Sequence, residues 1–377
     1  MKIRNILLLI TPSSQGRFAG IAKIARESGW HLTSADRLTH NLDGWTGDGA
    51  LVTLRDDEEQ IAYVRTLVRK GIPVVDLTAA RKDIRLPRVS SDNAEIGRVA
   101  AKHLIEKRLS RAAWFSTGWG YQHEERFKGF SAMFKTPVER WAWALSPKKT
   151  NADDWKSLTR WLERKIKAAT LPIGVMCFDD EDASRMESVV LGMGLSVPGD
   201  VAIVGAGNDT LLCECQPVSI SSVRNNLARN GHAGAALLKR LMDGAKKPVK
   251  PILIQPQGVE ARASSDTLAV TSPLVRRAKT IYEENLKNPP STVQLAEMLG
   301  VSRATLDRAV MDDIGLSPAQ MLIRLRIDQA KRLLSEGRLS VSETAYALGF
   351  CNPSHFSNLF RRHTGISPTK FPPPISD

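Results

Sequence analysis

Short apolar runs alternate with longer amphipathic segments over the first 265 residues of the chain. The apolar runs have the length and composition of buried strands, and they lie at 6–10, 50–54, 74–77, 112–116, 175–178 and 201–204. The segments between them place apolar residues at helical spacing, near 17–28, 57–70, 92–108, 151–169 and 181–193. Such alternation predicts parallel sheets with helices on both faces. Because this stretch is long for one such sheet, we expect two lobes with a cleft between them.

The pattern changes after a short polar stretch that Pro273 closes. We place a linker over 266–273, which separates a domain at 1–265 from a domain at 274–377. Beyond the linker no strand pattern remains, and the apolar residues recur with a period of 3.6. The expected helices lie at 275–287, 292–299, 303–311, 318–334, 341–348 and 353–362. The sequence therefore predicts a two-lobed α/β domain followed by an all-α domain.

One helical pattern occurs twice in the second domain. In each copy a short helix ends at a glycine, Gly300 or Gly349, and a second helix begins a few residues later. Glycine accommodates the positive φ of such a turn. Ser302 and Asn352 stand where the second helix needs a capping residue. The repeat predicts two helix-turn-helix units that are separated by the long helix at 318–334.

The outward side chains of each second helix distinguish DNA readout from simple bundle packing. We expect Leu306 and Val310 to face inward in the first copy, and Phe356 and Phe360 in the second. A single polar helix face is more often only solvated, but two copies at matched spacing favour DNA readout. Side chains of Arg, Asn and Ser can bond base edges or phosphates. The residues predicted to contact DNA are Ser302, Arg303, Ala304, Asp307, Arg308, Ser354, His355, Asn358, Arg361 and Arg362.

Charge and composition limit the partners and the compartment. The net charge of +13 and the pI near 9.7 favour a polyanionic partner. Residues 272–377 carry 14 Lys and Arg against 10 Asp and Glu, so the charge is not concentrated in the helical domain. The four cysteines are too sparse for a disulfide framework, and we expect reduced thiols. The first apolar run is short for a secretory signal and no segment is long enough to span a bilayer, so we expect a cytoplasmic protein without membrane contact.

Residues 272–377 resemble an AraC/XylS-type DNA-binding domain. The motifs that carry the resemblance are Leu295-Ala296, Gly300-x-Ser302-x-x-x-Leu306, Gly315-x-Ser317-Pro318, Arg326-x-x-x-Ala330-x-x-Leu333-Leu334, Ala345-x-x-x-Gly349-Phe350, His355-Phe356-Ser357-x-x-Phe360-Arg361 and Gly365-x-Ser367-Pro368. Val310 and Met311 depart from the pattern, where Phe and a basic residue are usual. The resemblance implies double-stranded operator DNA as partner, with two recognition helices in successive major grooves about 34 Å apart. It also implies transcription activation, with RNA polymerase as a further partner.

The first domain resembles the effector domain of LacI-type repressors, which is similar to periplasmic sugar-binding proteins. The motifs are Ser91-Asp92-Asn93-x-x-x-Gly97-x-x-Ala100-x-x-His103-Leu104, Arg126-x-x-Gly129-Phe130, Cys177-Phe178-Asp179-Asp180-x-x-Ala183 and Gly194-Leu195-x-Val197-Pro198-x-Asp200-Val201-x-Ile203-Val204-Gly205. Joined to an AraC-type domain, it resembles the regulators of xylose operons. This implies a pentose, with xylose favoured, as the small-molecule ligand, and a homodimer paired through the lobes. Gly207 stands where the family often has Asp, so the identity of the sugar stays open.

The ligand site is expected at the carboxyl ends of the parallel strands. By motif position, Asp180 and Asn208 are the expected acceptor and donor of one lobe, and Arg126 is the clamp from the other. We expect the carboxylate of Asp180 to project into the cleft. Asp209, Ser14 and Trp119 complete the predicted ligand set. Trp30, Trp45, Trp114 and Trp119 are all candidates for a ring that stacks on the sugar, although a core position is more common for any one of them.

The acidic cluster Asp179-Asp180-Glu181-Asp182 also fits a metal site or a pair of catalytic carboxylates. It opens a predicted helix, however, where the helix dipole favours acidic residues in any case. The sequence contains no phosphate-binding GxxxxGK[ST] loop, HExxH motif or nucleophile elbow. We therefore expect no enzyme activity, cofactor or metal. A sugar-binding protein for uptake and a sugar enzyme, neither of which regulates DNA directly, stay open as alternatives.

Overall fold

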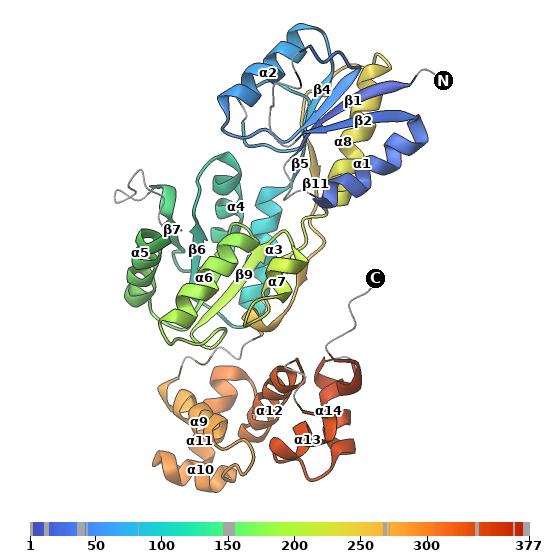
Figure 1. The fold of residues 1–377 in the computed structure, drawn as a ribbon. Coiled ribbons are helices and arrows are strands. Elements are labelled where there is room, and N and C mark those ends of the chain that lie inside the picture. Colours follow the sequence, from blue (N-terminus) through green and yellow to red (C-terminus); the bar gives the residue numbers. More distant parts are fainter. Residues whose placement is uncertain are drawn as a thin grey trace. The chain divides into compact units, whose positions relative to one another are not determined.

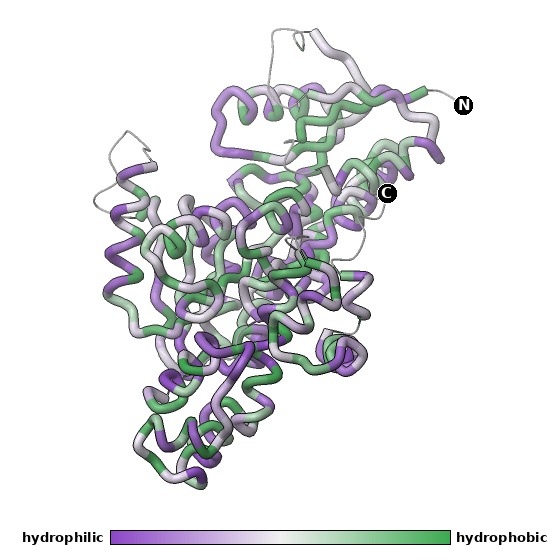
Figure 2. Tube along the Cα trace, turned by 60° about the horizontal axis from the view of Figure 1, so that its bottom comes forward, coloured by the Kyte–Doolittle hydropathy of each residue, from purple (hydrophilic) through white to green (hydrophobic). Residues whose placement is uncertain are grey.

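A computed structural model describes residues 3–10, 15–35, 42, 44–81, 83–145, 155–266, 270, 272–335, 339–364 and 366–371. Its contacts divide the chain into two units, Met1–Thr267 and Leu268–Asp377 (Figure 1). This division falls within the predicted linker, whose own ends at 266 and 273 remain a prediction. Hydrophilic and hydrophobic stretches alternate along the trace of both units (Figure 2). Among the described residues, none of the helices combines the length and the apolar character that crossing a bilayer requires.

The first lobe of the first unit is built on a parallel sheet with the order β2-β1-β3-β4. Its strands are β1 (Arg4–Leu9), β2 (Trp30–Ala35), β3 (Gly49–Val52) and β4 (Val74–Asp76), and its helices are α1 (Gln15–Ser28), α2 (Glu58–Arg69) and α8 (Leu227–Met242). Side chains alternate along a strand, so β1 contributes to two cores. Ile6 and Leu8 pack with α1 and α8, whereas Leu7 and Leu9 pack with α2. Both faces of the sheet are thereby covered.

The second lobe contains a larger sheet with the order β12-β10-β9-β8-β6-β7, in which β12 pairs antiparallel and the other pairs are parallel. Its strands are β6 (Ala112–Ser116), β7 (Glu139–Ala142), β8 (Ile173–Cys177), β9 (Val201–Ala206), β10 (Ser221–Val223) and β12 (Val259–Glu260). Its helices are α3 (Asn93–Glu106), α4 (Tyr121–Ser131), α5 (Trp155–Ala168), α6 (Asp180–Gly192) and α7 (Thr210–Glu214). The predicted fold class, a two-lobed α/β domain of periplasmic-binding type before an all-α domain, is confirmed.

A small parallel pair, β5 (Val89–Ser91) with β11 (Ile252–Ile254), lies where the chain passes from one lobe to the other. After β5 the chain enters α3 of the second lobe, and after β11 it enters β12. A further connection runs from β10 to α8, back into the first lobe. After β12 the last residues of the unit pack against β9 and β10 of the second-lobe sheet.

The second unit contains α9 (Pro273–Glu284), α10 (Thr292–Leu299), α11 (Arg303–Ile314), α12 (Pro318–Ser335), α13 (Val341–Ala347) and α14 (Pro353–Thr364). Two cores hold it together, one around α9, α10 and α11 and the other around α13 and α14. Helix α12 belongs to both cores. Each predicted helix of this unit is present in the structure.

Candidate functional site

Asp180 lies at the carboxyl end of β8 and is buried, with 3% of its surface exposed. Its Oδ1 accepts a hydrogen bond from the Ser222 hydroxyl at 2.5 Å, and its Oδ2 accepts one from the backbone N–H of Asp209 at 2.8 Å. Burial raises the pKa of this carboxyl, and the hydrogen bonds oppose the shift. The carboxylate thus faces the neighbouring strand ends of its own lobe, and the expectation that it projects freely into a cleft is corrected.

Two glycines explain why the carboxylate of Asp180 turns in this direction. A Cβ atom at Gly205 would lie 2.4 Å from Oδ1 of Asp180, and one at Gly207 would lie 2.8 Å from Oδ2. Only a glycine leaves enough room for the carboxylate at these positions. Gly207, which the sequence marks as a departure from the family pattern, therefore has a packing role beside Asp180.

Asn208 follows Gly207 in a left-handed conformation, with φ of 57°. Its backbone N–H donates to the Ser222 hydroxyl at 3.0 Å, and its Oδ1 accepts from Nη1 of Arg262 at 2.9 Å. Asp209 caps α7 and accepts from the Leu212 N–H at 3.1 Å. The structure therefore brings Asp180, Asn208 and Asp209 together at the ends of β8, β9 and β10. Ser222 and Arg262 also belong to this cluster, and the sequence did not point to either.

Arg126 lies on α4 and is also buried, with 5% of its surface exposed. Its Nε and Nη2 donate to Oδ1 of Asn93 at 3.1 and 2.7 Å, and its Nη1 donates to the carbonyl of Phe178. Burial lowers the pKa of this guanidinium to about 10. Helix α4 follows β6 of the second-lobe sheet, so Arg126 belongs to the same lobe as Asp180. The expectation that Arg126 clamps from the other lobe is wrong, because α4 packs on α3 of this sheet.

Trp119 occupies the loop that follows β6 and is half-buried. Its ring lies 6.1 Å from the ring of His123 and 6.2 Å from that of Phe127, with the Arg140 guanidinium 4.7 Å from its centroid. The ring of His123 stacks on Phe178 at 3.7 Å, and burial lowers the pKa of His123 to about 4. This aromatic group stands at the same strand-end edge as Asp180.

The other tryptophans considered for the site lie elsewhere. Trp114 is fully buried within β6. Trp30 begins β2 and Trp45 precedes β3, so both stand at the amino ends of parallel strands. Of these four tryptophans, Trp119 is the one that the structure places at a carboxyl end. Ser14, the remaining predicted ligand residue, lies outside the described residues.

The acidic residues that open α6 have structural partners. Asp179 caps the helix and accepts from the Asp182 N–H at 2.8 Å. Asp182 accepts from the backbone N–H and the hydroxyl of Thr117 at 3.1 and 2.9 Å. Burial raises the pKa of Asp182 to about 7. In the described part of the chain, no three His, Cys, Asp or Glu side chains are grouped to hold a metal ion.

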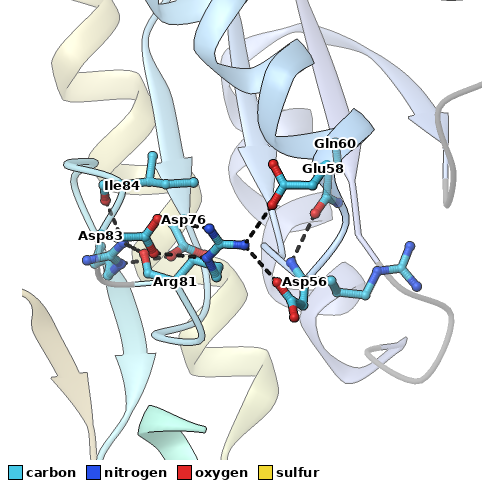
Figure 3. A network of polar contacts seen from close by, with 9 residues as sticks. Asp56, Glu58, Gln60, Asp76, Arg81, Asp83 and Ile84 are labelled. Atoms are coloured by element: carbon cyan, nitrogen blue, oxygen red, sulfur yellow. Dashed lines mark hydrogen bonds and ion pairs between the residues drawn. The ribbon is translucent and has the colours of Figure 1, made fainter. Parts of the chain in front are cut away.

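The first lobe presents a second polar cluster at the carboxyl end of β4 (Figure 3). Asp76 is fully buried and accepts from Nε of Arg88 at 2.8 Å. Arg81 bonds both carboxylate oxygens of Asp83 at 2.9 Å and reaches Asp56 at 2.8 Å.

The backbone N–H groups of the nearby Ala79 and Ala80 donate to the Gln122 side-chain oxygen of the second lobe at 2.9 and 3.1 Å, in the amide orientation that satisfies both. The strand-end edges of the two lobes therefore meet here.

Both second helices of the helix-turn-helix repeats have the predicted orientation. Leu306, Val310, Phe356 and Phe360 are fully buried. The outward side chains are exposed, apart from Asp307, which is half-buried and 3.5 Å from Nε of Arg303. The exposed set comprises Ser302, Arg303, Ala304, Arg308, Ser354, His355, Asn358, Arg361 and Arg362. Contact of these residues with DNA stays a prediction.

The two turns are formed as the sequence predicts. Ser302 caps α11 and accepts from the Thr305 N–H at 3.1 Å, and Asn352 accepts from the Ser354 N–H at 2.7 Å. Gly300 and Gly349 have φ of 71° and 74°. Arg326 of α12 donates to the carbonyl of Leu286 at 3.0 Å, and its guanidinium lies 5.2 Å from the ring of Phe350. It thus ties the second turn to the segment that follows α9.

Residues 101–265 match the periplasmic binding protein-like domain family, and residues 295–372 match a helix-turn-helix domain family. The xylose operon regulatory protein of Escherichia coli K12 is 24% identical over 372 residues, which cover 92% of this chain and 90% of the relative. The corresponding protein of Haemophilus influenzae is 24% identical over 355 residues, with 91% and 90% covered. The chain is a transcription regulator with a periplasmic-binding-like domain and a helix-turn-helix domain. It is not an enzyme.

Solved structures agree with this regulator architecture. A structure described as a xylose-binding transcription activator superposes with a TM-score of 0.70, at 21% identity, and 98% of each chain is covered. A transcriptional regulator in complex with cellobiose has a TM-score of 0.55 at 22% identity, with 69% of this chain and 84% of that chain covered. The similarity to the first structure extends over both units of the regulator. The match to xylose operon regulatory proteins over 92% of this chain sets aside the alternatives of an uptake protein and of a sugar enzyme.

Proposed function

We propose that this regulator senses a pentose, with xylose favoured over other sugars, and controls an operon for the catabolism of that sugar. The observation that carries the proposal is the match in domain order to xylose operon regulatory proteins over 92% of the chain. The protein acts in the cytoplasm on double-stranded operator DNA. Activation of transcription, with RNA polymerase as a partner, is part of the proposal and follows from the AraC/XylS-type resemblance.

The proposed sugar site lies at the ends of β8, β9 and β10. Vicinal hydroxyls require several fixed donors and acceptors, and an aromatic ring can cover the C–H face of the sugar. Asn208 and Asp209 supply polar groups, and Trp119 supplies the ring. Asp180 holds the loop of Asn208 in place. Ser14 stays in the proposed set by its position after the first strand.

Arg126 has a place in the proposed site although it belongs to the same lobe as Asp180. Its contacts to Asn93 and Phe178 use three of the five N–H groups of the guanidinium. We propose that the other two bond sugar oxygens. Because the described contacts already fix the plane of the guanidinium, a sugar would meet donors whose direction is set before binding.

The proposed operator contacts come from α11 and α14. The ten residues predicted from the sequence supply exposed hydroxyl, imidazole, amide and guanidinium groups, together with a small alanine surface. A homodimer formed through the first unit completes the proposal, on the LacI-type resemblance. Sedimentation at micromolar concentration, with and without D-xylose, tests it, and a monomeric mass in both conditions contradicts it.

Calorimetry of the full chain against D-xylose, L-arabinose, D-ribose and D-glucose tests the ligand. We expect D-xylose to bind most tightly and to change the affinity for the operator of a xylose catabolic operon, measured by fluorescence anisotropy. A ligand changes an equilibrium only through its different affinities for the two states, so both affinities must be measured. If none of the four sugars produces heat of binding at a protein concentration of about 100 μM, the proposal is contradicted.

A further inference from the structure

The last segment of the first unit is anchored on the second-lobe sheet. A single 3-10 turn, η4 (Ala263–Ser265), precedes the linker, and both of its serines are fully buried. The Ser264 hydroxyl donates to the carbonyl of Ile203 in β9 at 2.7 Å. The Ser265 hydroxyl donates to that of Ser221 in β10 at 2.7 Å. The segment that leads to the helix-turn-helix unit is therefore bonded to the strands that carry the proposed sugar site.

Strand β10 bonds both to the proposed sugar site and to the segment before the linker. It does so through two consecutive serines, Ser221 and Ser222, which are fully buried. Successive side chains of a strand point to opposite faces. Ser222 bonds to Asp180 and to the N–H of Asn208, in the proposed sugar site. Ser221 donates to the carbonyl of Arg262 at 3.0 Å and accepts from its N–H at 2.7 Å. The backbone of Arg262 is thereby fixed on the face opposite to Asp180.

The side chain of Arg262 reaches from this segment into the loop of the proposed sugar site. Its Nη1 donates to Oδ1 of Asn208 at 2.9 Å and to the carbonyl of Ile220 at 3.1 Å. Its Nη2 donates to Glu214 at 3.1 Å. The side chain is largely buried, with 12% exposed, whereas that of Glu214 is 49% exposed. Arg262 therefore has its backbone beside η4 and its cationic group on Asn208.

The bond to Arg262 determines which end of the Asn208 amide is free. Guanidinium is a donor without acceptor capacity, so it holds the Oδ1 end of the amide. The Nδ2 end, with two N–H donors, then points away from Arg262. A sugar oxygen needs such a donor, whereas a reversed amide would present a second oxygen to it. Arg262 thus determines that Asn208 offers its N–H donors, and not its oxygen, to a ligand in the proposed site.

We propose that Arg262 is a positioning residue that orients Asn208 for the sugar and couples occupancy of the site to the segment entering the helix-turn-helix unit. This inference rests on the proposed function, because it takes Asn208 as a sugar contact. When a sugar bonds the amide of Asn208, any shift of that amide is transmitted to the guanidinium, and from there to the backbone next to η4.

The test compares Arg262→Ala with Glu214→Gln in the full chain. Glu214→Gln weakens the exposed ion pair and leaves the bond between Arg262 and Asn208 intact. We expect Arg262→Ala to lower the affinity for D-xylose about tenfold, measured by calorimetry, and to reduce the effect of D-xylose on operator affinity. Glu214→Gln should stay within about twofold of the parent in both. If the two variants have the same affinity for D-xylose and the same effect of D-xylose on operator affinity, the proposal is overturned.

A double-mutant cycle with Asn208→Ala separates positioning from general destabilisation. If Arg262 acts through Asn208, the double variant binds D-xylose no more weakly than Asn208→Ala alone. Additive losses contradict this relation and indicate a role that does not involve Asn208. Thermal unfolding of each variant confirms that it is folded at the temperature of the titration.

Hydrogen exchange without sugar keeps this test independent of the ligand proposal. We expect Arg262→Ala to accelerate amide exchange in the loop of Asn208 and in residues 263–266, and Glu214→Gln to leave both unchanged. If the parent binds no D-xylose, the proposed ligand is wrong, and the exchange data still decide whether Arg262 holds these two segments together. Unchanged exchange in Arg262→Ala overturns the positioning role.

Discussion

The guanidinium of Arg126 lies 4.4 Å from the centroid of the Phe178 ring and donates to the carbonyl of the same residue. Phe178 is the residue directly before the acidic start of α6. The cation therefore fixes the end of β8, from which the proposed sugar site is built, and it does so from a buried position. This geometry gives Arg126 a part in site formation even before a sugar is bound.

Replacement of Arg126 by Ala is expected to lower the affinity for D-xylose tenfold or more. The variant removes the donors to the carbonyl of Phe178 and to Oδ1 of Asn93, at about 1–3 kcal/mol in stability. Calorimetry measures the first effect and urea unfolding the second. Arg98→Ala, which removes an exposed arginine paired with Glu95 at 2.6 Å, serves as the control and should change neither quantity measurably. Unchanged sugar affinity of Arg126→Ala contradicts the placement of the site.

Asp180→Ala is expected to weaken D-xylose binding about tenfold or more, because the Asp209 N–H in the loop of Asn208 and the Ser222 hydroxyl of β10 both lose their acceptor. Operator affinity without sugar should remain near that of the parent. Calorimetry and fluorescence anisotropy on the same preparation report the two affinities. Equal affinity of the variant and the parent for D-xylose refutes the role of this carboxylate in the site.

The two helix-turn-helix turns allow a matched glycine comparison. A Cβ at Gly349 would lie 2.0 Å from the carbonyl of Lys287 and 2.6 Å from Nη2 of Arg326, whereas none of the atoms the structure describes lies within 4 Å of a Cβ at Gly300. Gly300→Ala should therefore cost about 1 kcal/mol for its positive φ alone. Gly349→Ala should cost about 1–3 kcal/mol more because its surroundings must move. Thermal unfolding followed by circular dichroism checks the order of the two variants.

Arg308→Ala and Asn358→Ala should each cost about 1–3 kcal/mol in operator binding if each side chain bonds a base. Arg276→Ala removes an exposed arginine of α9, outside both turns, and is the control. Anisotropy titrations on operator and on random DNA of the same length separate base contacts from phosphate contacts. Equal losses on both DNAs indicate that the side chain bonds phosphate alone.

Glu187 should make stability depend on pH. It is buried, its Oε1 accepts from the Val218 N–H at 2.7 Å, and its Oε2 has no hydrogen-bond partner among the described residues. Burial raises its pKa from 4.5 to about 7. The folded state holds this proton more tightly than the unfolded state. The stability that the proton contributes is therefore complete below pH 4.5 and is lost as the pH rises to about 7.

Glu187→Gln is expected to remove this part of the pH dependence, since the amide stays neutral. The melting temperature of the parent should fall more steeply than that of the variant between about pH 5 and pH 7. Glu59→Gln, at an exposed position of α2, should follow the parent. If the melting temperatures of Glu187→Gln and of the parent change in parallel with pH across this range, the pKa of Glu187 is not raised.

The sequence predicts the strands that are apolar along their whole length, and the structure contains all of them. The strands that escaped prediction are β5, β7, β10, β11 and β12, with two to four residues each, and the half-exposed edge strand β2. Their formation depends on pairing with distant segments, which no local pattern records. Helices of the second unit are predicted well because each carries its own apolar stripe and cap.

The same distinction holds for the site. Asp180 and Asn208 follow recognisable strands, so their proximity follows from the rule that parallel strands end at one edge. Other features of the site depend on which strands are neighbours in the sheet. These features are the direction of the Asp180 carboxylate, the lobe to which Arg126 belongs, and the contacts of Ser222 and Arg262. Ser222 lies in a three-residue strand, and Arg262 follows the last strand of the unit. Neither position stands out before the order of the sheet is known.

Helix α12 supplies Met321 and Leu325 to one core of the second unit and Ile327 and Ala330 to the other. Packing of one helix in both cores therefore limits changes in the separation and rotation between the two turns. B-form DNA presents the same groove face about every 10.5 base pairs. An insertion of about five base pairs between the two contacted segments would carry the second segment to the far side of the duplex, where α14 cannot follow. If both α11 and α14 contact DNA as proposed, operator affinity should therefore depend on the length of the tract between the two contacted segments.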